Sequence, residues 1–404
     1  MGEHAYAHVP VMAGRIAALL LPALTGPTPG GRPPVLIDAT LGRAGHARAF
    51  LDAVPGLLLI GIDADAAAVE AGHALAVRYP GQVTVAHAFY DRIAALLLPA
   101  LAGPAAGGRP PVLIDATLGR AGHARAFLDA VPDLLLIGID ADAAAIETGR
   151  ALAERYPGRV TVAHAFYDHI AEIAADAGHR RVQGILFDLG VSSPQLDDTS
   201  RGFSYSRDAP LDMRMDQGAG LTAARIVNEY PVPELARVLF EYGEEKFGRR
   251  IAEAIARERA DEPITGTLRL SAIVKDAIPA AARRTGGNPA KRTFQALRIE
   301  VNDELGALRR ALPAALDLLA PGGRLAALAY HSLEDRLVKR ELAERTADKT
   351  PPGIPLRAGD VLAGTPRFRL LTRGAERPGD EELAVNPRSA SARLRAVERL
   401  RAAA

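Results

Sequence analysis

The fold is decided by the stretch Val112-Leu-Ile-Asp-Ala-Thr-Leu-Gly-Arg-Ala-Gly-His123 and by the run Leu134-Leu-Leu-Ile-Gly-Ile-Asp140 that soon follows it. Together they predict a short apolar strand, a glycine turn over Gly119–Gly122, a helix over Ala124–Ala130 and a second apolar strand that ends on an acid. Strands that are apolar throughout and alternate with helices are typical of a parallel sheet covered on both faces.

This stretch occurs twice in the chain. Residues Arg15–Asp91 reappear as Arg92–Asp168, with an offset of 77 residues and nine differences. Such a period is longer than the units of solenoid proteins, so the repeat is a duplicated piece of a domain. One sheet needs only one set of three strands, and we therefore expect one copy to complete a working site.

Composition narrows the class of protein. A chain of 404 residues has room for two or more domains, and the absence of cysteine excludes disulfides and cysteine-ligated zinc. The N-terminal residues lack a signal-peptide pattern, and the apolar run around Leu19–Leu21 is too short to span a bilayer. We expect a cytoplasmic protein without a membrane partner.

The remaining elements extend this α/β domain and interrupt it with helices. Further strands are predicted at Val160–Ala163, Gly184–Leu189 and Arg324–Tyr330, with a closing strand pair at Phe368–Thr372 and Ser391–Glu398. Helices without intervening strands are predicted at Leu221–Glu229, Val232–Tyr242, Phe247–Arg259 and Leu270–Ile278. Two later helices are predicted at Phe294–Leu319 and Ser332–Arg345, with a turn at Pro321–Gly323 between them.

These elements divide the chain into an arm (1–14), the first copy (15–91), the first part of the α/β domain (92–206), a helical insertion (207–292) and the second part of the α/β domain (293–404). From Lys246 to Arg310 there are fourteen Lys or Arg residues against eight Asp or Glu residues, although the net charge of the chain is +1. This local excess favours a phosphate-binding face. The alternative is a solvated helical surface rich in arginine.

The glycine turn and the acid after it indicate a cofactor. The turn lacks the spacing Gly-x-Gly-x-x-Gly and no Gly-Lys-Ser/Thr follows it, which disfavours dinucleotides and nucleoside triphosphates. Asp140 ends the next strand, where an acid accepts the hydroxyl groups of a ribose. An acid without a phosphate loop indicates an adenosine without phosphates, namely S-adenosylmethionine. The alternative is a plain glycine turn with a helix-capping aspartate.

Polar residues also follow the fourth and fifth predicted strands. Asp188 and Gln195 come after the fourth strand, at the edge of a parallel sheet where ligands bind, although a polar surface loop is the alternative. His331 follows the fifth strand in the same way, but Ser332 with Asp335 also forms a good helix cap, and the two interpretations weigh equally. The histidines are not spaced as metal ligands, so we predict no metal site.

Eight motifs then identify a family. They are His8–Met12, Ile114–His123, Phe187–Asp198, Arg201–Asp216, Tyr242–Phe247, Arg292–Arg298, Tyr330–Arg336 and Asn386–Ala390 with Arg393. In their order and density the chain resembles the bacterial 16S ribosomal RNA cytosine-N4 methyltransferases, which act on a decoding-site cytidine. The resemblance covers nearly all of the chain apart from one copy of the repeat.

The resemblance implies a Rossmann-like sheet that uses S-adenosylmethionine, with an inserted helical domain that helps to hold RNA. It assigns the methionine side of the cofactor to Ala121, Gly122 and His123, the ribose to Asp140, the adenine to Tyr167, and the rest of the pocket to Asp188 and Gln195. Asp188 and His331 are the candidate catalytic residues. The implied partner is 16S ribosomal RNA within the small ribosomal subunit, and a homodimer is a further candidate. The chain departs from the family at Ala121, where glycine is frequent, and in the duplication.

The duplication offers two cofactor sites. We favour the second copy, because it runs directly into the strand that ends at Asp188 without a large intervening insertion. The alternative set in the first copy is Ala44, Gly45, His46, Asp63 and Tyr90. The spare copy is expected to add to the sheet edge or to be poorly ordered.

Two other classes of function stay open. One is a non-catalytic RNA-binding ribosome assembly factor that retains the methyltransferase fold. The other is a nicotinamide-dependent oxidoreductase on the same fold, against which the missing phosphate fingerprint argues.

Overall fold

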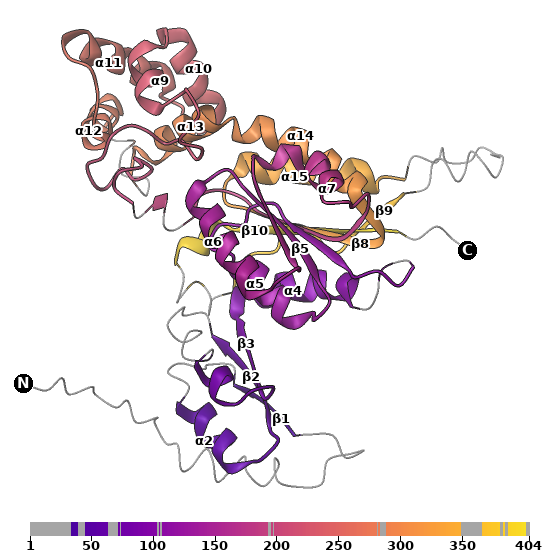
Figure 1. The fold of residues 1–404 in the computed structure, drawn as a ribbon. Helices are drawn as coiled ribbons and strands as arrows, with labels where there is room; N and C mark the ends of the chain where they lie inside the picture. Colours follow the sequence, from indigo (N-terminus) through magenta and orange to yellow (C-terminus); the bar gives the residue numbers. More distant parts are fainter. Residues whose placement is uncertain are drawn as a thin grey trace, which may run out of the picture. The chain divides into compact units, whose positions relative to one another are not determined.

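The computed structural model describes residues 34–38, 45–63, 72, 74–102, 105, 107–192, 195–196, 198–280, 282, 288–348, 366–379, 383 and 387–400. The chain divides into two compact units (Figure 1). One comprises residues Met1–Pro99 with Glu376–Ala392, and the other comprises Ala100–Ala375 with Arg393–Ala404.

A seven-stranded sheet forms the centre of the second unit, in the order β6-β5-β4-β7-β8-β10-β9. Its parallel strands are β4 (Val112–Asp115), β5 (Leu135–Asp140), β6 (Val160–His164), β7 (Val182–Asp188) and β8 (Leu319–Ala329). The closing strands β10 (Arg393–Arg399) and β9 (Phe368–Leu370) are antiparallel to their neighbours. The predicted Rossmann-like α/β sheet and its closing strand pair are thereby confirmed.

Helices cover both faces of this sheet (Figure 1). On one side lie α7 (Ile170–Asp176), α14 (Glu304–Leu318) and α15 (Ser332–Thr346), and on the other α5 (Gly122–Ala130) and α6 (Ala143–Arg155). Alternate strand residues such as Ile114, Ile185 and Phe187 pack against Leu312 of α14 and Leu342 of α15. All five are essentially inaccessible to solvent, so this apolar layer holds the strand ends that carry the site.

A second apolar core belongs to a group of helices in the same unit. They are α9 (Ala223–Glu229), α10 (Val232–Gly243), α11 (Gly248–Asp261), α12 (Thr267–Ala277) and α13 (Lys291–Asn302). The four helices predicted without intervening strands are confirmed as α9 to α12. Among the described residues, none of the helices is long and apolar enough to cross a membrane.

Two details of the prediction were wrong. The long helix predicted over Phe294–Leu319 is broken at Asp303, which has φ 47° and separates α13 from α14. Asparagine and aspartate tolerate this left-handed conformation better than most residues, and Asn302-Asp303 supplies both. The turn predicted at Pro321–Gly323 lies instead within β8, where the register with β7 shifts between Val182 and Gly184.

The first copy of the repeat forms a sheet of its own. Its strands are β1 (Val35–Asp38), β2 (Leu58–Asp63) and β3 (Val83–His87), and its helices are α2 (Gly45–Ala53) and α4 (Ala88–Leu101), which runs on into the second copy. Val35 pairs with Leu58 as Val112 pairs with Leu135, because the two copies share the same sequence.

The spare copy was expected either to add to the edge of the main sheet or to be poorly ordered. The first expectation is wrong for the described residues, because β1 to β3 form a separate sheet, and the second stays a prediction. Each copy contains three strands that can pair with one another, and a buried patch around Phe50, Leu57 and Leu59 gives the first copy a small core. The strand that follows the repeat, β7, is not part of the duplication. Among the described residues it pairs with β4 of the second copy.

Candidate functional site

Three aspartates meet at one edge of the seven-stranded sheet. Asp115, Asp140 and Asp188 are the last residues of β4, β5 and β7, which are neighbours in the sheet. Because the strands are parallel, their carboxyl ends lie at the same edge, which is where open α/β sheets bind ligands. Asp140 and Asp188 were predicted as site residues from the sequence, whereas Asp115 was not, although it too ends an apolar strand.

The turn after β4 is held in a left-handed conformation. Gly119 has φ +49° and Ala121 has φ 57° and ψ 24°, immediately before α5 begins at Gly122. A glycine adopts this conformation freely, whereas a residue with a β-carbon pays about 1–2 kcal/mol. A glycine in place of Ala121 would therefore hold the same turn without this cost.

Asp140 ties that turn to the loop after β5. Its Oδ2 accepts a hydrogen bond from the backbone N–H of Gly119 at 2.8 Å, and its Oδ1 accepts one from Asp142 N at 2.8 Å. Burial raises the pKa of Asp140, and hydrogen bonds from the backbone N–H groups of Asp142, Gly119 and Ala141 oppose that rise. A carboxylate has about four lone pairs, so this group, already held in place, can still accept a hydrogen bond from a ribose.

Asp188 is positioned by residues from three other elements. Its Oδ1 accepts a hydrogen bond from the Tyr330 hydroxyl at 2.9 Å, and its Oδ2 lies 3.5 Å from His123 Nε2. Its backbone N–H donates to Thr117 Oγ1 at 2.7 Å. The His123 side chain is only 10% exposed, so the carboxylate faces a largely buried partner on one side.

Asp115 lies fully buried beneath these groups. Burial raises its pKa to about 7, although nearby His123 and a hydrogen bond from Thr117 N act in the opposite direction. The two neighbouring aspartates, Asp140 and Asp188, raise it further because three negative charges at one sheet edge repel one another. The edge therefore favours either a proton on Asp115 or a positive charge brought by a ligand.

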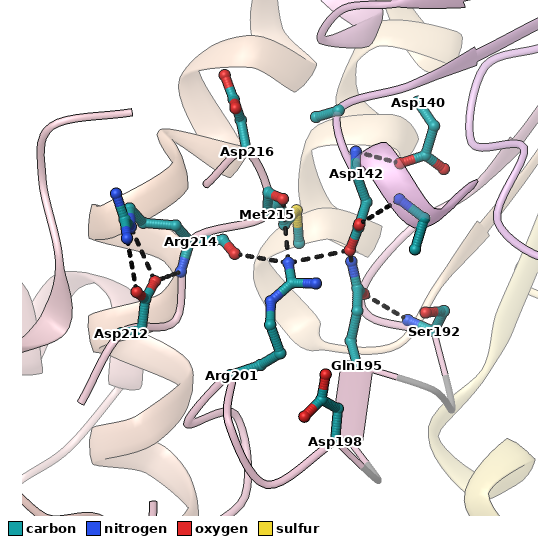
Figure 2. Close-up of polar contacts among 12 residues, drawn as sticks. Asp140, Asp142, Ser192, Gln195, Asp198, Arg201, Asp212, Arg214, Met215 and Asp216 are labelled. Atoms are coloured by element: carbon teal, nitrogen blue, oxygen red, sulfur yellow. Dashed lines mark hydrogen bonds and ion pairs between the residues drawn. The ribbon is translucent and has the colours of Figure 1, made fainter. Parts of the chain in front are cut away.

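Gln195 and Asp142 form a contact that the sequence did not predict (Figure 2). Gln195 Nε2 donates to Asp142 Oδ2 at 2.7 Å, and Gln195 Oε1 accepts a hydrogen bond from Ser192 N at 2.9 Å. Asp142 also caps α6, because its Oδ1 accepts from Ala144 N at 3.0 Å. The amide of Gln195 is thus engaged by the protein itself, and its contact with a cofactor stays a prediction.

Tyr167 is held from two sides. Its ring stands edge-on to Phe187, with ring centroids 5.7 Å apart and an angle of 86° between the planes. Its hydroxyl donates to the backbone carbonyl of Glu304 at 3.1 Å, and burial raises its pKa well above the ordinary value. The contact predicted between Tyr167 and an adenine stays a prediction, and it would involve the ring rather than the hydroxyl.

His331 caps α15, which corrects the predicted cap of Ser332 with Asp335. The Nδ1 of His331 accepts a hydrogen bond from Glu334 N at 3.4 Å, and Glu334 Oε2 accepts one from His331 N at 3.2 Å. The same Oε2 accepts one from Tyr330 N at 2.8 Å. The helix begins at Ser332 because the histidine before it completes a capping box with Glu334.

A polar cluster lies behind His331. One carboxylate oxygen each of Glu304 and Glu334 and one ring nitrogen of His331 lie within 4.8 Å of one another. Arg298 donates two hydrogen bonds to Glu304, at 2.7 and 2.8 Å, and the side chains of this pair are 14% and 7% exposed. The guanidinium supplies the positive charge that these carboxylates require, so the cluster is an internal ion-pair network.

The alternative site in the first copy falls largely outside the described residues. Ala44 lies outside them, and so do the side chains of His46, Asp63 and Tyr90, while Gly45 is the first residue of α2.

The fold and the site define an S-adenosylmethionine-dependent methyltransferase. The donor set fits this cofactor: a glycine turn without a phosphate cradle, a ribose-type acid in Asp140, and carboxylates that suit a sulfonium cation. Residues 5–103 and, separately, residues 106–400 match the MraW methylase family. The chain belongs to that family, and S-adenosylmethionine is its methyl donor.

Named relatives agree with this assignment. The ribosomal RNA small subunit methyltransferase H of Frankia alni is 58% identical over 311 residues, which cover 76% of this chain and 93% of the relative. The protein of the same name from Thermobifida fusca is 56% identical and covers 77% of this chain and 92% of its own. The one from Salinispora tropica is 57% identical over 323 residues, with 79% and 86% covered.

Proposed function

We propose that the chain transfers a methyl group from S-adenosylmethionine to the N4 amine of a decoding-site cytidine in 16S ribosomal RNA. The names of its relatives support the ribosomal RNA substrate, since each is called a ribosomal RNA small subunit methyltransferase. The observation that carries the proposal is Asp188, oriented by Tyr330 at 2.9 Å and set at the same sheet edge as Asp140.

Such a carboxylate suits the chemistry of an exocyclic amine. The lone pair of a cytosine N4 amine is delocalised into the ring, so the amine must be oriented and one of its N–H groups accepted in a hydrogen bond. Asp188 would accept that N–H, with the base held out of its stack. When bound, S-adenosylmethionine would supply an activated methyl group and would leave as S-adenosylhomocysteine. Asp188 would accept the proton that N4 loses on methylation.

The other site residues would bind and orient. We assign Ala121, Gly122 and His123 to the methionine side of the cofactor, Asp140 to the ribose, Tyr167 to the adenine, and Gln195 to the wall of the pocket. His331 would act on the reaction as a positioning residue, because its cap with Glu334 fixes the backbone of Tyr330, whose hydroxyl reaches Asp188.

We further propose that the helical group holds the RNA. Arg249, Arg250 and Arg257 of α11 are exposed, and α10 beside it carries Phe240 with 68% of its surface exposed. Arginines attract phosphates, and an exposed ring provides a surface on which an unstacked base can lie. Arg283 and Arg284, which also contribute to the local positive charge, lie outside the described residues.

Nucleoside analysis tests the proposed substrate. The purified protein is incubated with methyl-labelled S-adenosylmethionine and small ribosomal subunits that lack the modification, and the RNA is digested to nucleosides. We expect the label on N4 of a cytidine at a single position. Label on a ring carbon would contradict the proposal, and so would cofactor binding without any methylation of the subunits, which is the behaviour of a non-catalytic assembly factor.

A further inference from the structure

Arg201 forms a buried ion pair with Asp142, which lies two residues after Asp140 (Figure 2). Its Nη2 lies 3.0 Å from Asp142 Oδ2, and the two side chains are only 8% and 7% exposed. The backbone N–H of Asp142 in turn donates to Asp140 Oδ1 at 2.8 Å. Arg201 belongs to the loop after β7, so this pair links that loop to the loop after β5.

The same guanidinium nitrogen of Arg201 holds the segment Met213–Met215. Nη2 also donates to the carbonyls of Arg214 at 2.9 Å and Met215 at 3.1 Å, and the carbonyl of Arg201 accepts from Met213 N at 2.9 Å. Met213 has φ 60°, an unfavourable conformation that persists only where its surroundings impose it.

Asn302 at the end of α13 holds the same segment from the helical group. Its Oδ1 accepts from Met215 N at 2.7 Å, and its Nδ2 donates to the carbonyl of Met213 at 2.8 Å. The segment is thus held from two directions. Arg201 and Asp142 connect it to Asp140, and Asn302 connects it to the helical group.

The ion pair of Arg201 with Asp142 depends on both residues, because each neutralises the buried charge of the other. Burial would raise the pKa of Asp142, but hydrogen bonds from Gln195 and Arg201 keep it below the ordinary value. Removal of Arg201 leaves a buried carboxylate with fewer partners, which is costly because the desolvation of Asp142 is no longer offset. The loop after β5 then loses one of its anchors, and Asp140, the last residue of β5, is held by the backbone N–H of Asp142 in that loop.

We propose that Arg201 is a positioning residue that couples cofactor binding at Asp140 to the order of the segment Met213–Met215. The coupling rests on the proposed binding of the cofactor at Asp140, but not on the identity of the methyl acceptor. A ligand that fixes the Asp140 carboxylate favours one arrangement of Asp142 and, through Arg201, one arrangement of the segment. The effect is reciprocal, so an ordered segment also raises the affinity for the cofactor.

Limited trypsin digestion tests the coupling without RNA. The readout is the rate of cleavage after Arg207, an exposed residue in the same loop, with and without S-adenosylhomocysteine. We expect the ligand to slow this cleavage by about fivefold or more in the unaltered protein, and to have little effect in Arg201→Met. Arg225→Met is the matched control, because Arg225 is exposed and pairs with Glu229 within α9, outside the segment.

Calorimetric titration with S-adenosylhomocysteine completes the test. We expect Arg201→Met to weaken binding about fivefold or more, and to weaken it little further in an Asp142→Asn background, where the link is already changed. Retained protection and affinity in Arg201→Met would overturn the proposal, as would equal losses in Arg225→Met. Because neither measurement uses RNA, a wrong assignment of the methylated nucleoside would leave these results unaffected.

Discussion

Replacement of Asp115 by asparagine should change how the stability of the protein depends on pH. Asp115 is fully buried, and burial raises its pKa from 3.8 to about 7. The folded state therefore holds this proton more tightly than the unfolded state does. The stability that the proton contributes is complete below about pH 4 and is lost as the pH rises towards 7.

The size of the effect follows from that pKa shift. At 1.36 kcal/mol for each pH unit, the rise from 3.8 to about 7 corresponds to about 4 kcal/mol over the whole range. Between about pH 5 and about pH 8 the unaltered protein should lose roughly 2–3 kcal/mol of unfolding free energy through Asp115 alone. Asp115→Asn cannot ionise, so it should not show this loss, and it keeps an oxygen that can accept from Thr117 N.

Urea unfolding followed by circular dichroism provides the assay. The free energy of unfolding is measured for both proteins at the two pH values, and the difference between their changes is the quantity of interest. A fixed cost of the asparagine amide cancels in that comparison, as do other titrating groups that both proteins share. Parallel changes in the two proteins would refute the reasoning, because Asp115 would then titrate as it does in the unfolded chain.

The remaining predictions concern the cofactor, the RNA and the duplication. Asp140→Ala should weaken S-adenosylhomocysteine binding by about 1–3 kcal/mol in a calorimetric titration, because ribose hydroxyls lose a charged acceptor; unchanged affinity would exclude Asp140 from the site. Arg249→Glu should weaken RNA binding and make it less dependent on salt while sparing cofactor affinity; loss of both would indicate unfolding. A variant without residues 15–91 should still bind S-adenosylhomocysteine as tightly as the full chain, because β4 to β6 of the second copy pair within the seven-stranded sheet; absence of binding would show that the first copy is required.

Local pattern in the sequence was enough to predict the sheet and its acids. Asp140 and Asp188 were found because each ends a continuous apolar run, and parallel strands bring such ends to one edge. The helices α9 to α12 were found because their apolar residues recur at helical spacing. Asp115 ends a run of the same kind and could have been found by the same signal.

Contacts between distant segments could not be predicted in this way. The pairing of Arg201 with Asp142 and the hold of Asn302 on Met213 depend on loops that meet only in the folded chain. The break at Asp303 had no signal stronger than the helical pattern around it. Both copies carry the same strand sequences, so the second copy could be favoured only by its place in the chain directly before β7, with which β4 pairs.

The most direct test of the account compares Asp140→Ala with its matched counterpart in the first copy, Asp63→Ala. Both proteins are incubated with methyl-labelled S-adenosylmethionine and unmodified small ribosomal subunits, and the rate of label transfer to cytidine N4 is measured at limiting cofactor. We predict that Asp140→Ala loses most of the rate and that Asp63→Ala retains it, because the second copy supplies the strand that pairs with β7. Loss of the rate in Asp63→Ala alone would contradict the account.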